Sequence, residues 1–463
     1  MIFRRGLSIL FLFTLAACQP APVHLTETPS AQVTLPPQAT VTPQPATQTA
    51  VADVVLPRGT TIQIWHPWFG IEANLFQSQV DEFNQTNQWG IVVQTTSQSD
   101  YNELFQNVSA SLPTADHPQL VIGLPEYALL WNTNDNVVDL TNYVNDPKYG
   151  LSDGDIKDIP SVFWDQDEVG GQRLGIPAER SARFLLYDAS WARELGFDSA
   201  PATADDFRLQ ACAAHASMLK DQDRSNDGMG GWLVDTQVMT ALSWLRAFGG
   251  GAVEGNDYRF LTPNNLSALT FIKQLYDDGC SWKPADPSTV YDSFANRKAL
   301  FSTASLEELS DQSRAFAAAS NSDEWTVLAF PGSGQNAQSR LIVYGSSYIV
   351  LKSTPAQQLA SWLFVRWMLS PENQAKWVEA LGLFPLRTSS MPLLKDYINS
   401  HPQWTAAVAL LSNAEIQPQL ASWRIVRVML GDGFNDIFSS NIPAGRVAST
   451  LAQMDSIVRD LSK

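Results

Sequence analysis

The chain has 463 residues and a formal charge of −17 at pH 7, because 47 Asp and Glu outnumber 30 Lys and Arg. Nucleic acids and anionic membrane surfaces are bound through clustered Lys and Arg, so this composition excludes both as expected partners. After the N-terminal segments described next, roughly 400 residues remain, which is more than one hydrophobic core usually supports. The length therefore predicts two lobes or domains.

The N-terminus has the pattern of an export signal that ends in a cysteine. Arg4 and Arg5 precede the apolar run 7–17, which has the length of a signal core and is too short to span a bilayer. The run ends in LAAC, up to Cys18, and resembles the lipobox of bacterial lipoproteins. This resemblance implies a signal peptide at 1–18 that ends at a lipidated Cys18, and an extracytoplasmic protein anchored to the cell membrane. The alternative is an ordinary secretory signal with a chance cysteine.

Residues 19–57 consist almost wholly of Pro, Thr, Gln, Ala and Val. Such a segment cannot bury a core, and it predicts a disordered, extended tether with a root-mean-square reach of about 35 Å. No second apolar stretch has the length of a transmembrane helix. We therefore expect the folded part to hang from the membrane without lying in it.

Two cysteines follow Cys18, namely Cys212 and Cys280. An exported protein enters an oxidising compartment, which permits a disulfide between them. Spacing alone does not show that their Cβ atoms meet, so two buried free thiols are the alternative. A reactive thiol has no supporting motif in the sequence.

The first part of the folded region alternates between predicted strands and helices. An alternating, β-branched run at 60–65 predicts a strand that delivers the loop 66–70. The elements that follow are an amphipathic helix marked by Phe76, Val80 and Phe83, a strand at 91–93, a helix at 100–112 and a buried strand at 120–124. This alternation predicts an α/β fold with a mainly parallel sheet.

Later segments have longer helical periods. Helices are predicted at 203–220, 236–248, 263–278, 355–369 and 371–381, and strands at 325–330 and 341–351. Pro355 and Pro371 stand in the first turns of their helices, where proline costs least. The chain shows no internal repeat of fixed period.

Several short sequence motifs, or phrases, follow one another along the chain in a recognisable order. They are Ile62–Trp65 with Asp81–Asn84, Asp139–Tyr143, Gly175–Ala178 with Phe184–Asp188, Ser370–Trp377 and Gly382–Arg387. Together they resemble the extracellular solute-binding protein family 1, the maltose-binding-like receptors of ABC importers. The last two phrases, SPENQAKW and GLFPLR, are the most specific, and the resemblance covers nearly all of 60–400.

The resemblance implies a two-lobed α/β fold like that of the periplasmic binding proteins. Each lobe then has a mainly parallel sheet flanked by helices, and crossing hinge strands join the lobes around a ligand cleft. Carried onto this chain, the N-terminal lobe takes 58–178 and 296–340. The C-terminal lobe takes 182–294 and 345–463.

A sugar site needs flat aromatic side chains for the apolar face of the ring and polar side chains for its hydroxyls. The chain has 15 Trp, although any single Trp is more often part of a core. We expect ligand contacts after predicted strands, where α/β folds place ligands, and at the presumed crossing between lobes. The candidates are Trp65, His66, Trp68, Glu126, Tyr127, Arg180, Trp232, Tyr344 and Trp423.

Two of these interpretations have structural alternatives of equal weight. Glu126 and Tyr127 follow the buried strand, but they also suit a capped turn. Arg180 at the presumed crossing could reach hydroxyls, and it could equally form a structural salt bridge.

The segment 221–228 places oxygen-bearing side chains at alternate positions, as at the start of a calcium loop. The predicted ligands are Asp221, Asp223, Ser225 and Asp227. Asn226 stands where the turn glycine of an EF-hand belongs, and Trp232 stands where its bidentate Glu belongs. A surface Asx-rich turn is the alternative, and no other cofactor is expected.

The resulting hypothesis is a monomeric, lipid-anchored receptor that captures a carbohydrate and delivers it to the permease subunits of an ABC importer, without catalysis. A surface-anchored carbohydrate-active enzyme with two carboxylates is one alternative. A receptor for a polyamine or peptide is another, favoured by an anionic cleft. The sequence has no HExxH, GxSxG or Walker A motif, which excludes zinc peptidases, α/β-hydrolases and P-loop NTPases.

Overall fold

The computed structural model describes residues 51–334, 338–439 and 443–461. The predicted signal peptide, Cys18 and the tether as far as residue 50 lie outside these ranges. The folded part begins before the predicted tether boundary at 57, because Val51–Asp53 form a 3-10 helix, η1, and Val51 is buried in the hydrophobic core. Within the described ranges, none of the helices combines the length and apolar character that a membrane span requires.

The first lobe is built on a sheet with the strand order β2-β1-β3-β15-β6. Its strands are β1 (Thr61–His66), β2 (Val92–Ser97), β3 (Leu120–Gly123), β6 (Ile176–Pro177) and β15 (Ser347–Val350). β1 is parallel to β2 and β3, while β15 runs antiparallel to β3 and β6. β3 is buried along its whole length, as its apolar sequence predicts for a strand covered on both faces.

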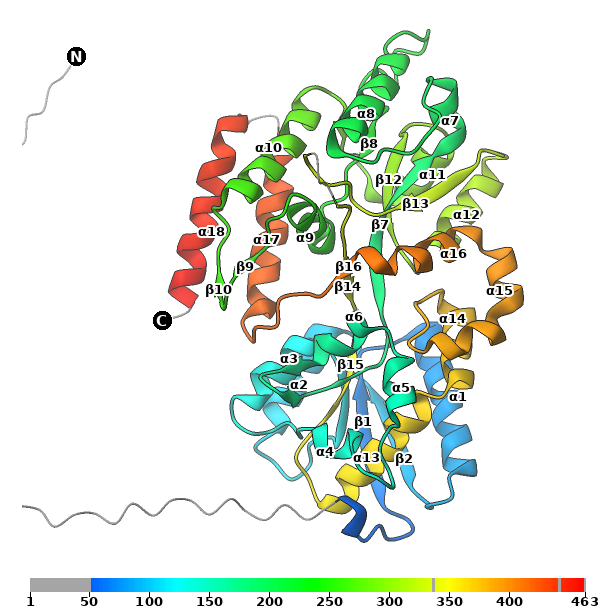
Figure 1. Ribbon diagram of the computed structural model, residues 1–463, viewed down its shortest axis with the longest axis vertical. Coiled ribbons are helices and arrows are strands. Elements are labelled where there is room, and N and C mark those ends of the chain that lie inside the picture. Colours follow the sequence, from blue (N-terminus) through cyan, green and yellow to red (C-terminus); the bar gives the residue numbers. More distant parts are fainter. Residues whose placement is uncertain (1–50, 335–337, 440–442, 462–463) are drawn as a thin grey trace, which may run out of the picture. The chain divides into compact units, whose positions relative to one another are not determined.

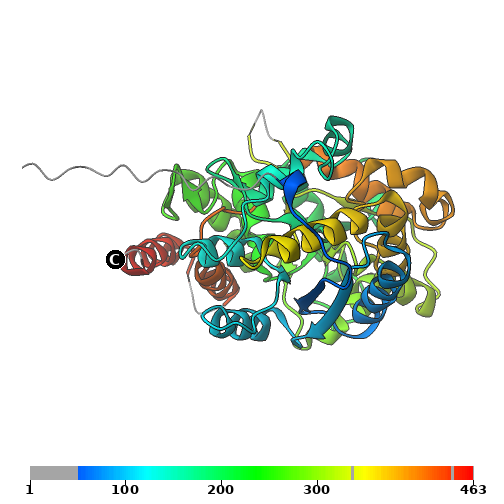
Figure 2. The ribbon, with the colours of Figure 1, turned by 90° about the horizontal axis from the view of Figure 1, so that it is seen from below.

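Helices cover this sheet, and capping side chains mark the starts of three of them. The helices are α1 (Gly70–Thr86), α2 (Tyr101–Ser111), α3 (Pro125–Asn132), α13 (Pro355–Met368) and α14 (Pro371–Leu381). The side chains of Asp100, Thr354 and Ser370 cap α2, α13 and α14 by accepting hydrogen bonds from backbone N–H groups. α13, the yellow helix in Figure 2, packs against β1, β15 and α1.

Short elements connect α3 to β6. They are α4 (Thr141–Val144), α5 (Asp153–Lys157), α6 (Ser161–Trp164), the 3-10 helix η2 (Asp165–Asp167), and the hairpin of β4 (Glu168–Val169) with β5 (Gln172–Arg173).

The second lobe is built on a sheet with the order β11-β8-β12-β7-β14-β16, in which β13 also pairs with β7. Its strands are β7 (Ser181–Asp188), β8 (Trp232–Leu233), β11 (Ser281–Trp282), β12 (Phe301–Ser305), β13 (Trp325–Leu328), β14 (Leu341–Tyr344) and β16 (Ala414–Glu415). β7 pairs antiparallel with β12, β13 and β14, so it is the central strand of the lobe.

The helices of the second lobe include those predicted at 203–220, 236–248 and 263–278. The helices of this lobe are α7 (Ala189–Glu194), α8 (Ala204–Met218), α9 (Val238–Ala247), α10 (Pro263–Asp277), α11 (Val290–Ala295), α12 (Leu309–Ala318), α15 (Lys395–Ser400), α16 (Pro402–Ala409), α17 (Trp423–Ile437) and α18 (Val447–Leu461). The hairpin of β9 (Val253–Glu254) and β10 (Asp257–Tyr258) precedes α10.

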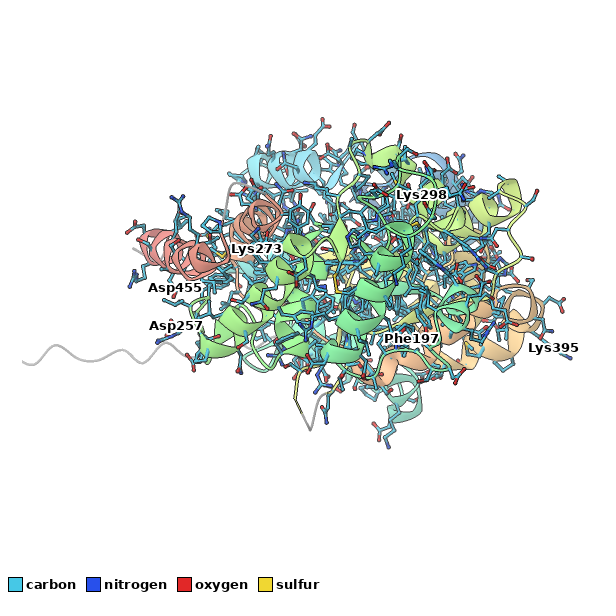
Figure 3. The ribbon with its side chains drawn as sticks, turned by 90° about the horizontal axis from the view of Figure 1, so that it is seen from above. Phe197, Asp257, Lys273, Lys298, Lys395 and Asp455 are labelled. Carbon is cyan, nitrogen blue, oxygen red and sulfur yellow. A yellow bond between two sulfur atoms is a disulfide. The ribbon has the colours of Figure 1, made fainter. Side chains whose placement is uncertain are left out.

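The C-terminal helices belong to the second lobe. α17 and α18 pack against each other, α17 packs on α9 and α18 packs on α10. Asp455 of α18, labelled in Figure 3, accepts hydrogen bonds from the backbone N–H groups of Phe260 at 2.6 Å and Leu261 at 3.2 Å. These contacts fix the end of the chain to the loop before α10.

A disulfide joins Cys212 of α8 to Cys280, the residue before β11. α8 also packs directly against β11. The bond therefore ties a helix to the strand at the end of the second sheet, and it decides between the paired and the free thiols that the sequence left open.

The division of the chain between the lobes differs from the predicted boundaries. Residues 296–340, expected in the N-terminal lobe, supply β12 and β13 to the second sheet, while 347–381 supply β15, α13 and α14 to the first. β15 is the yellow strand that stands among the blue strands in Figure 1.

The error arises at 294–296, where a crossing between lobes was predicted that does not occur, whereas the crossing predicted between 340 and 345 does occur. The predicted strand 341–351 is two strands of different sheets, and Gly345 stands between them with φ +144°. A Cβ built on Gly345 would lie 2.2 Å from the carbonyl oxygen of Glu179. Glycine therefore lets the chain leave β14 and cross tightly over the other crossing segment into β15.

Candidate functional site

A cavity of about 370 Å³ lies where the first lobe, the crossing segments and the second lobe meet. Its first wall is formed by loops at the carboxyl ends of parallel strands: Pro67–Phe69 after β1, Ser99–Tyr101 after β2 and Leu124 after β3. Open α/β sheets bind ligands at this edge. The remaining walls are formed by Glu72, Glu179, Ser181, Glu307, Tyr344, Gly345, Leu381 and Leu383. These fifteen residues define the interlobe cavity.

The loop after β1 is held rigidly beside β2. The Ser97 hydroxyl donates a hydrogen bond to the Trp68 carbonyl at 2.7 Å, and the Gln98 N–H donates to the His66 carbonyl at 2.8 Å. Trp68 is only 3% exposed and packs against Phe76 and Trp377. Phe69, the next residue, is 72% exposed. The loop thus anchors one aromatic side chain and presents the other at the cavity.

Carboxylates dominate the polar lining of the interlobe cavity. Glu72, Asp100, Glu179 and Glu307 contribute acidic side chains, and its lining includes no Lys, Arg or His. The Glu179 carboxylate accepts hydrogen bonds from the Tyr101 hydroxyl at 2.7 Å and from the Ser346 hydroxyl at 3.0 Å. The Ser181 hydroxyl donates to the carboxylate of Glu307.

The crowding of these carboxylates changes their acidity. Burial, followed by the negative charges of Glu179 and Glu307, raises the pKa of Glu72 from 4.5 to about 7. Glu307 keeps exposed surface, yet desolvation of its carboxylate raises its pKa as well. Burial and the charge of Glu179 raise the pKa of Tyr101 well above 10. The cavity is therefore a site where negative charge lacks compensation from the protein.

Arg180 holds the crossing segments together and does not line the cavity. Its side chain is buried and donates to the carboxylate of Asp167 at 2.7 Å, to the Ser346 carbonyl at 2.6 Å and to the Ser347 hydroxyl at 3.2 Å. Ser347 in turn donates to Asp167 at 2.7 Å. The structural alternative for Arg180 is therefore correct, because both terminal nitrogens of the guanidinium are engaged within the hinge.

The structure brings Trp68 and Tyr344 to the interlobe cavity, but it places most other predicted ligand contacts elsewhere. Trp65 is half-buried on β1, and His66 is buried, with its pKa lowered to about 4 by desolvation. Trp232 donates to the Thr303 hydroxyl at 3.1 Å and Trp423 donates to the Gln417 side chain at 3.2 Å, both inside the second lobe. These indoles serve the core, as isolated Trp residues usually do.

Glu126 and Tyr127 lie behind the cavity wall. Glu126 is buried, and its carboxylate lies 3.4 Å from the guanidinium of Arg427 on α17, so it connects the lobes. Burial raises its pKa, and the charge of Arg427 acts against that rise. The Tyr127 hydroxyl donates to the Tyr101 carbonyl at 3.1 Å. Both residues thus support residues of the cavity and the contact between lobes.

The predicted calcium segment forms local turns. The carboxylate of Asp221 accepts from the Asp223 N–H at 2.8 Å, and that of Asp223 accepts from the Ser225 N–H at 2.9 Å and its hydroxyl at 2.6 Å. Across 51–334, 338–439 and 443–461, no three His, Cys, Asp or Glu side chains are grouped closely enough to hold a metal ion.

A larger cavity of about 480 Å³ lies between α6, α9 and residues 414–418. Two of its three charged side chains, Arg246 and Glu415, form an ion pair with each other, and Asp165 is the third. It also lies away from the carboxyl ends of β1, β2 and β3. The interlobe cavity is therefore the stronger candidate for a ligand site.

The sequence interpretation missed the acidic lining of the site. Glu72 comes shortly after the predicted loop 66–70, and Glu179 is adjacent to the predicted crossing residue Arg180, so position in the sequence could have suggested both. Glu307 gave no such signal, because its segment was assigned to the wrong lobe.

The profile of a family described as bacterial extracellular solute-binding protein matches residues 78–411 of the chain. A Brucella abortus (strain 2308) protein that is named a binding protein is 21% identical over 329 residues, which are 69% of this chain and 74% of that protein. These are matches in sequence, and they extend across both lobes.

Solved structures show the same fold at low identity. The sugar-binding protein MalE from Xanthomonas citri matches with a TM-score of 0.72 and 19% identity, over 87% of this chain and 97% of that one. The cyclic α-maltosyl-1,6-maltose binding protein from Arthrobacter globiformis matches with 0.70 and 17%, over 86% and 99%. UgpB from Mycobacterium tuberculosis, solved with glycerophosphocholine, matches with 0.69 and 16%, over 87% and 99%. The expected two-lobed fold is confirmed.

Proposed function

The chain belongs to the bacterial extracellular solute-binding proteins, and from this premise we propose that it captures a carbohydrate in the interlobe cavity and delivers it to the permease of an ABC importer. The observation that carries the proposal is the position of that cavity. Both lobes and both crossing segments contribute to its walls, so a bound solute contacts parts of the chain that a hinge movement would bring together.

The chemistry of the lining supports a carbohydrate. Phe69, Tyr101 and Tyr344 offer aromatic surface for the apolar face of a sugar ring. Glu72 and Glu179 offer carboxylate oxygens, which accept strong hydrogen bonds from hydroxyls. Two of the similar structures are named as sugar-binding or maltosyl-maltose binding proteins, which agrees with this choice.

The sequence of the N-terminus supports a location at the membrane, which is the second part of the proposal. An export signal that ends at Cys18, followed by a Pro- and Thr-rich segment, is typical of a lipoprotein held at the membrane. A tethered receptor stays close to the permease, which raises its effective concentration there.

A screen for bound solutes tests the proposal. The purified protein is heated with mono-, di- and oligosaccharides, amino acids and polyamines, and every solute that stabilises it is then recovered and analysed. A ligand at 100 times its dissociation constant stabilises the native state by about 2.7 kcal/mol, which a melting curve detects. We expect a sugar that is recovered unchanged. A cleaved sugar would instead support the carbohydrate-active enzyme, since several carboxylates share the cavity.

The variant Phe69→Ala tests whether the sugar binds in the interlobe cavity. Phe69 is 72% exposed and lines the cavity, whereas Ile71 is 67% exposed and lies outside it. We expect Phe69→Ala to weaken sugar binding about ten-fold through lost ring contact, with little change in melting temperature. Ile71→Ala is the matched control and should bind as the wild type does. Equal affinities for the two variants would place the sugar elsewhere.

A further inference from the structure

Helix α17 has two faces that meet different lobes of the protein. Its apolar face is buried in the core of the second lobe through Trp423, Val426, Leu430, Phe434 and Ile437. Arg424 and Arg427 stand three residues apart, so they lie together on another face of the helix. α17 also packs against α3 of the first lobe (Figure 1). The helix is therefore fixed in one lobe and turns two cations toward the other.

Both arginines contact the first lobe. The guanidinium carbon of Arg424 lies 4.3 Å from the centre of the Phe105 ring on α2. Nη1 of Arg427 lies 3.4 Å from Oε1 of Glu126, which stands in the first turn of α3. Burial raises the pKa of Glu126, and the charges of Arg427 and Arg424 both act against that rise. The two cations therefore act on one region of the first lobe.

The buried carboxylate of Glu126 depends on this contact. Its side chain is 3% exposed, and its Oε1 has no hydrogen-bond partner. At 3.4 Å, Arg427 supplies charge attraction without a hydrogen bond. A buried charge that loses its partner is costly, and water can solvate it again only if the lobes move apart. The pair thus favours the arrangement in which α17 lies against α3.

These contacts lie directly behind a wall of the interlobe cavity. The hydroxyl of Tyr127 donates to the Tyr101 carbonyl at 3.1 Å, and the Tyr127 ring lies 4.9 Å from that of Phe105. Tyr101 itself lines the cavity. The contacts of α17 therefore hold the first-lobe wall of the cavity toward the second lobe.

A second set of contacts between the lobes lies at the hinge. The side-chain amide of Gln419 donates to three backbone carbonyls within 165–168 at 2.8, 2.9 and 3.0 Å. Asp167 of that segment is bonded to Arg180 of the crossing. A rotation moves atoms near its axis least, so these bonds can persist when the lobes swing apart. The contacts of α17 with α2 and α3 are the ones that such a rotation breaks.

We propose that Arg424 and Arg427 form an interlobe latch with Phe105 and Glu126, and that this latch holds the two lobes together before any solute binds. The latch can reopen, because the separated Glu126 and Arg427 regain water. Its strength sets the fraction of ligand-free molecules whose lobes are together, and a solute enters when it opens. The inference goes beyond the proposed function, since it requires no particular solute.

The distance between the lobes in the ligand-free protein tests the latch. Spin labels attached to Ala110→Cys on α2 and Gln453→Cys on α18, both exposed positions, report that distance by electron resonance. We expect mainly the short distance in the labelled protein with its latch intact. Arg427→Met leaves Glu126 buried without its cation and should raise the ratio of the long to the short distance at least about ten-fold.

Further variants separate the latch from general damage to the fold. Arg424→Met should raise the same ratio about three-fold, as the loss of a cation–π contact predicts. Glu126→Gln added to Arg427→Met removes the unpaired buried charge, so this double variant should return toward the short distance. Arg208→Met removes an exposed cation from α8 of the second lobe and should leave the distances unchanged. A melting curve of each variant confirms that it folds.

Three results would overturn the latch. They are an unchanged distance distribution in Arg427→Met, a double variant as open as Arg427→Met, and a long distance alone in the protein whose latch is intact. None of these measurements involves a solute. The latch and the carbohydrate receptor can therefore fail independently of each other.

Discussion

The carboxylate of Glu72 lowers the free energy of unfolding of the ligand-free protein at neutral pH. Its carboxylate lies in the interlobe cavity with Glu179 and Glu307, and its pKa is raised from 4.5 to about 7, first by burial and then by those charges. The folded state therefore binds the Glu72 proton more tightly than the unfolded state. Because the folded pKa lies above the unfolded one, this group destabilises the fold above pH 7, and the loss is recovered as the pH falls toward 4.5.

The magnitude follows from that shift. At about 1.4 kcal/mol per pH unit, a rise from 4.5 to about 7 corresponds to an upper bound of about 3.5 kcal/mol, which solvent screening of this partly exposed group reduces. Glu72 is partly exposed and stands in the first turn of α1, where a negative charge gains about 0.5 kcal/mol from the helix dipole. We therefore expect Glu72→Gln to raise the free energy of unfolding by about 2 kcal/mol at pH 8.

Urea unfolding of ligand-free wild type and Glu72→Gln at pH 8 and pH 5 measures this effect. Most of the gain should disappear at pH 5, because Glu72 of the folded wild type is protonated there. Glu103→Gln is the control, since Glu103 also stands in the first turn of a helix but is exposed and outside the cavity. A gain of equal size at both pH values, or a loss at pH 8, would refute the electrostatic reasoning.

Two further predictions concern the loop after β1 and the membrane anchor. Trp68→Ala should lower the free energy of unfolding by about 3 to 5 kcal/mol, because the indole is buried against Phe76 and Trp377, and a loss below about 1 kcal/mol in urea would show that it is dispensable to the core. Labelled fatty acid fed to expressing cells should appear in the wild type and not in Cys18→Ser, and equal label in both would remove Cys18 as the lipidated residue.

Periodicity was enough to predict the elements of the first lobe. The strands expected at 60–65 and 120–124 correspond to β1 and β3, and the helix expected at 100–112 corresponds to α2. These segments have local signals, namely alternation, an apolar run between prolines, and a capping Asp100. Their assignment needed no knowledge of distant parts of the chain.

The assignment of segments to lobes needed information that local patterns do not contain. The segment 341–351 was predicted as one strand, although Gly345, Ser346 and Ser347 interrupt its apolar residues and β14 and β15 lie in different sheets. Gly345 was the available signal, because a glycine inside a strand pattern often marks a close backbone approach. The wrong lobe for 296–340 came from a crossing predicted at 294–296, where the chain in fact stays in the second lobe.

The sequence predicted where the candidate site lies more successfully than it predicted which residues line the site. The loop after the first strand does line the cavity, as the rule for α/β sheets predicts. Trp68 and Tyr344 were chosen for their aromatic rings, while Glu72 and Glu307 were overlooked because single glutamates on helices and loops are common on any surface. Only the fold shows that these charges converge.

The insertion of β15 between β3 and β6 has a consequence for the order in which the chain folds. β3 ends at Gly123, and its antiparallel neighbour ends at Val350. At a synthesis rate of about 5 to 20 residues per second, β3 waits about 10 to 45 s for this neighbour to be made. Pairing across so long a stretch of chain is also slow in itself. The first sheet therefore stays incomplete until β15 has been synthesised, and the first lobe cannot finish folding before the chain reaches that strand.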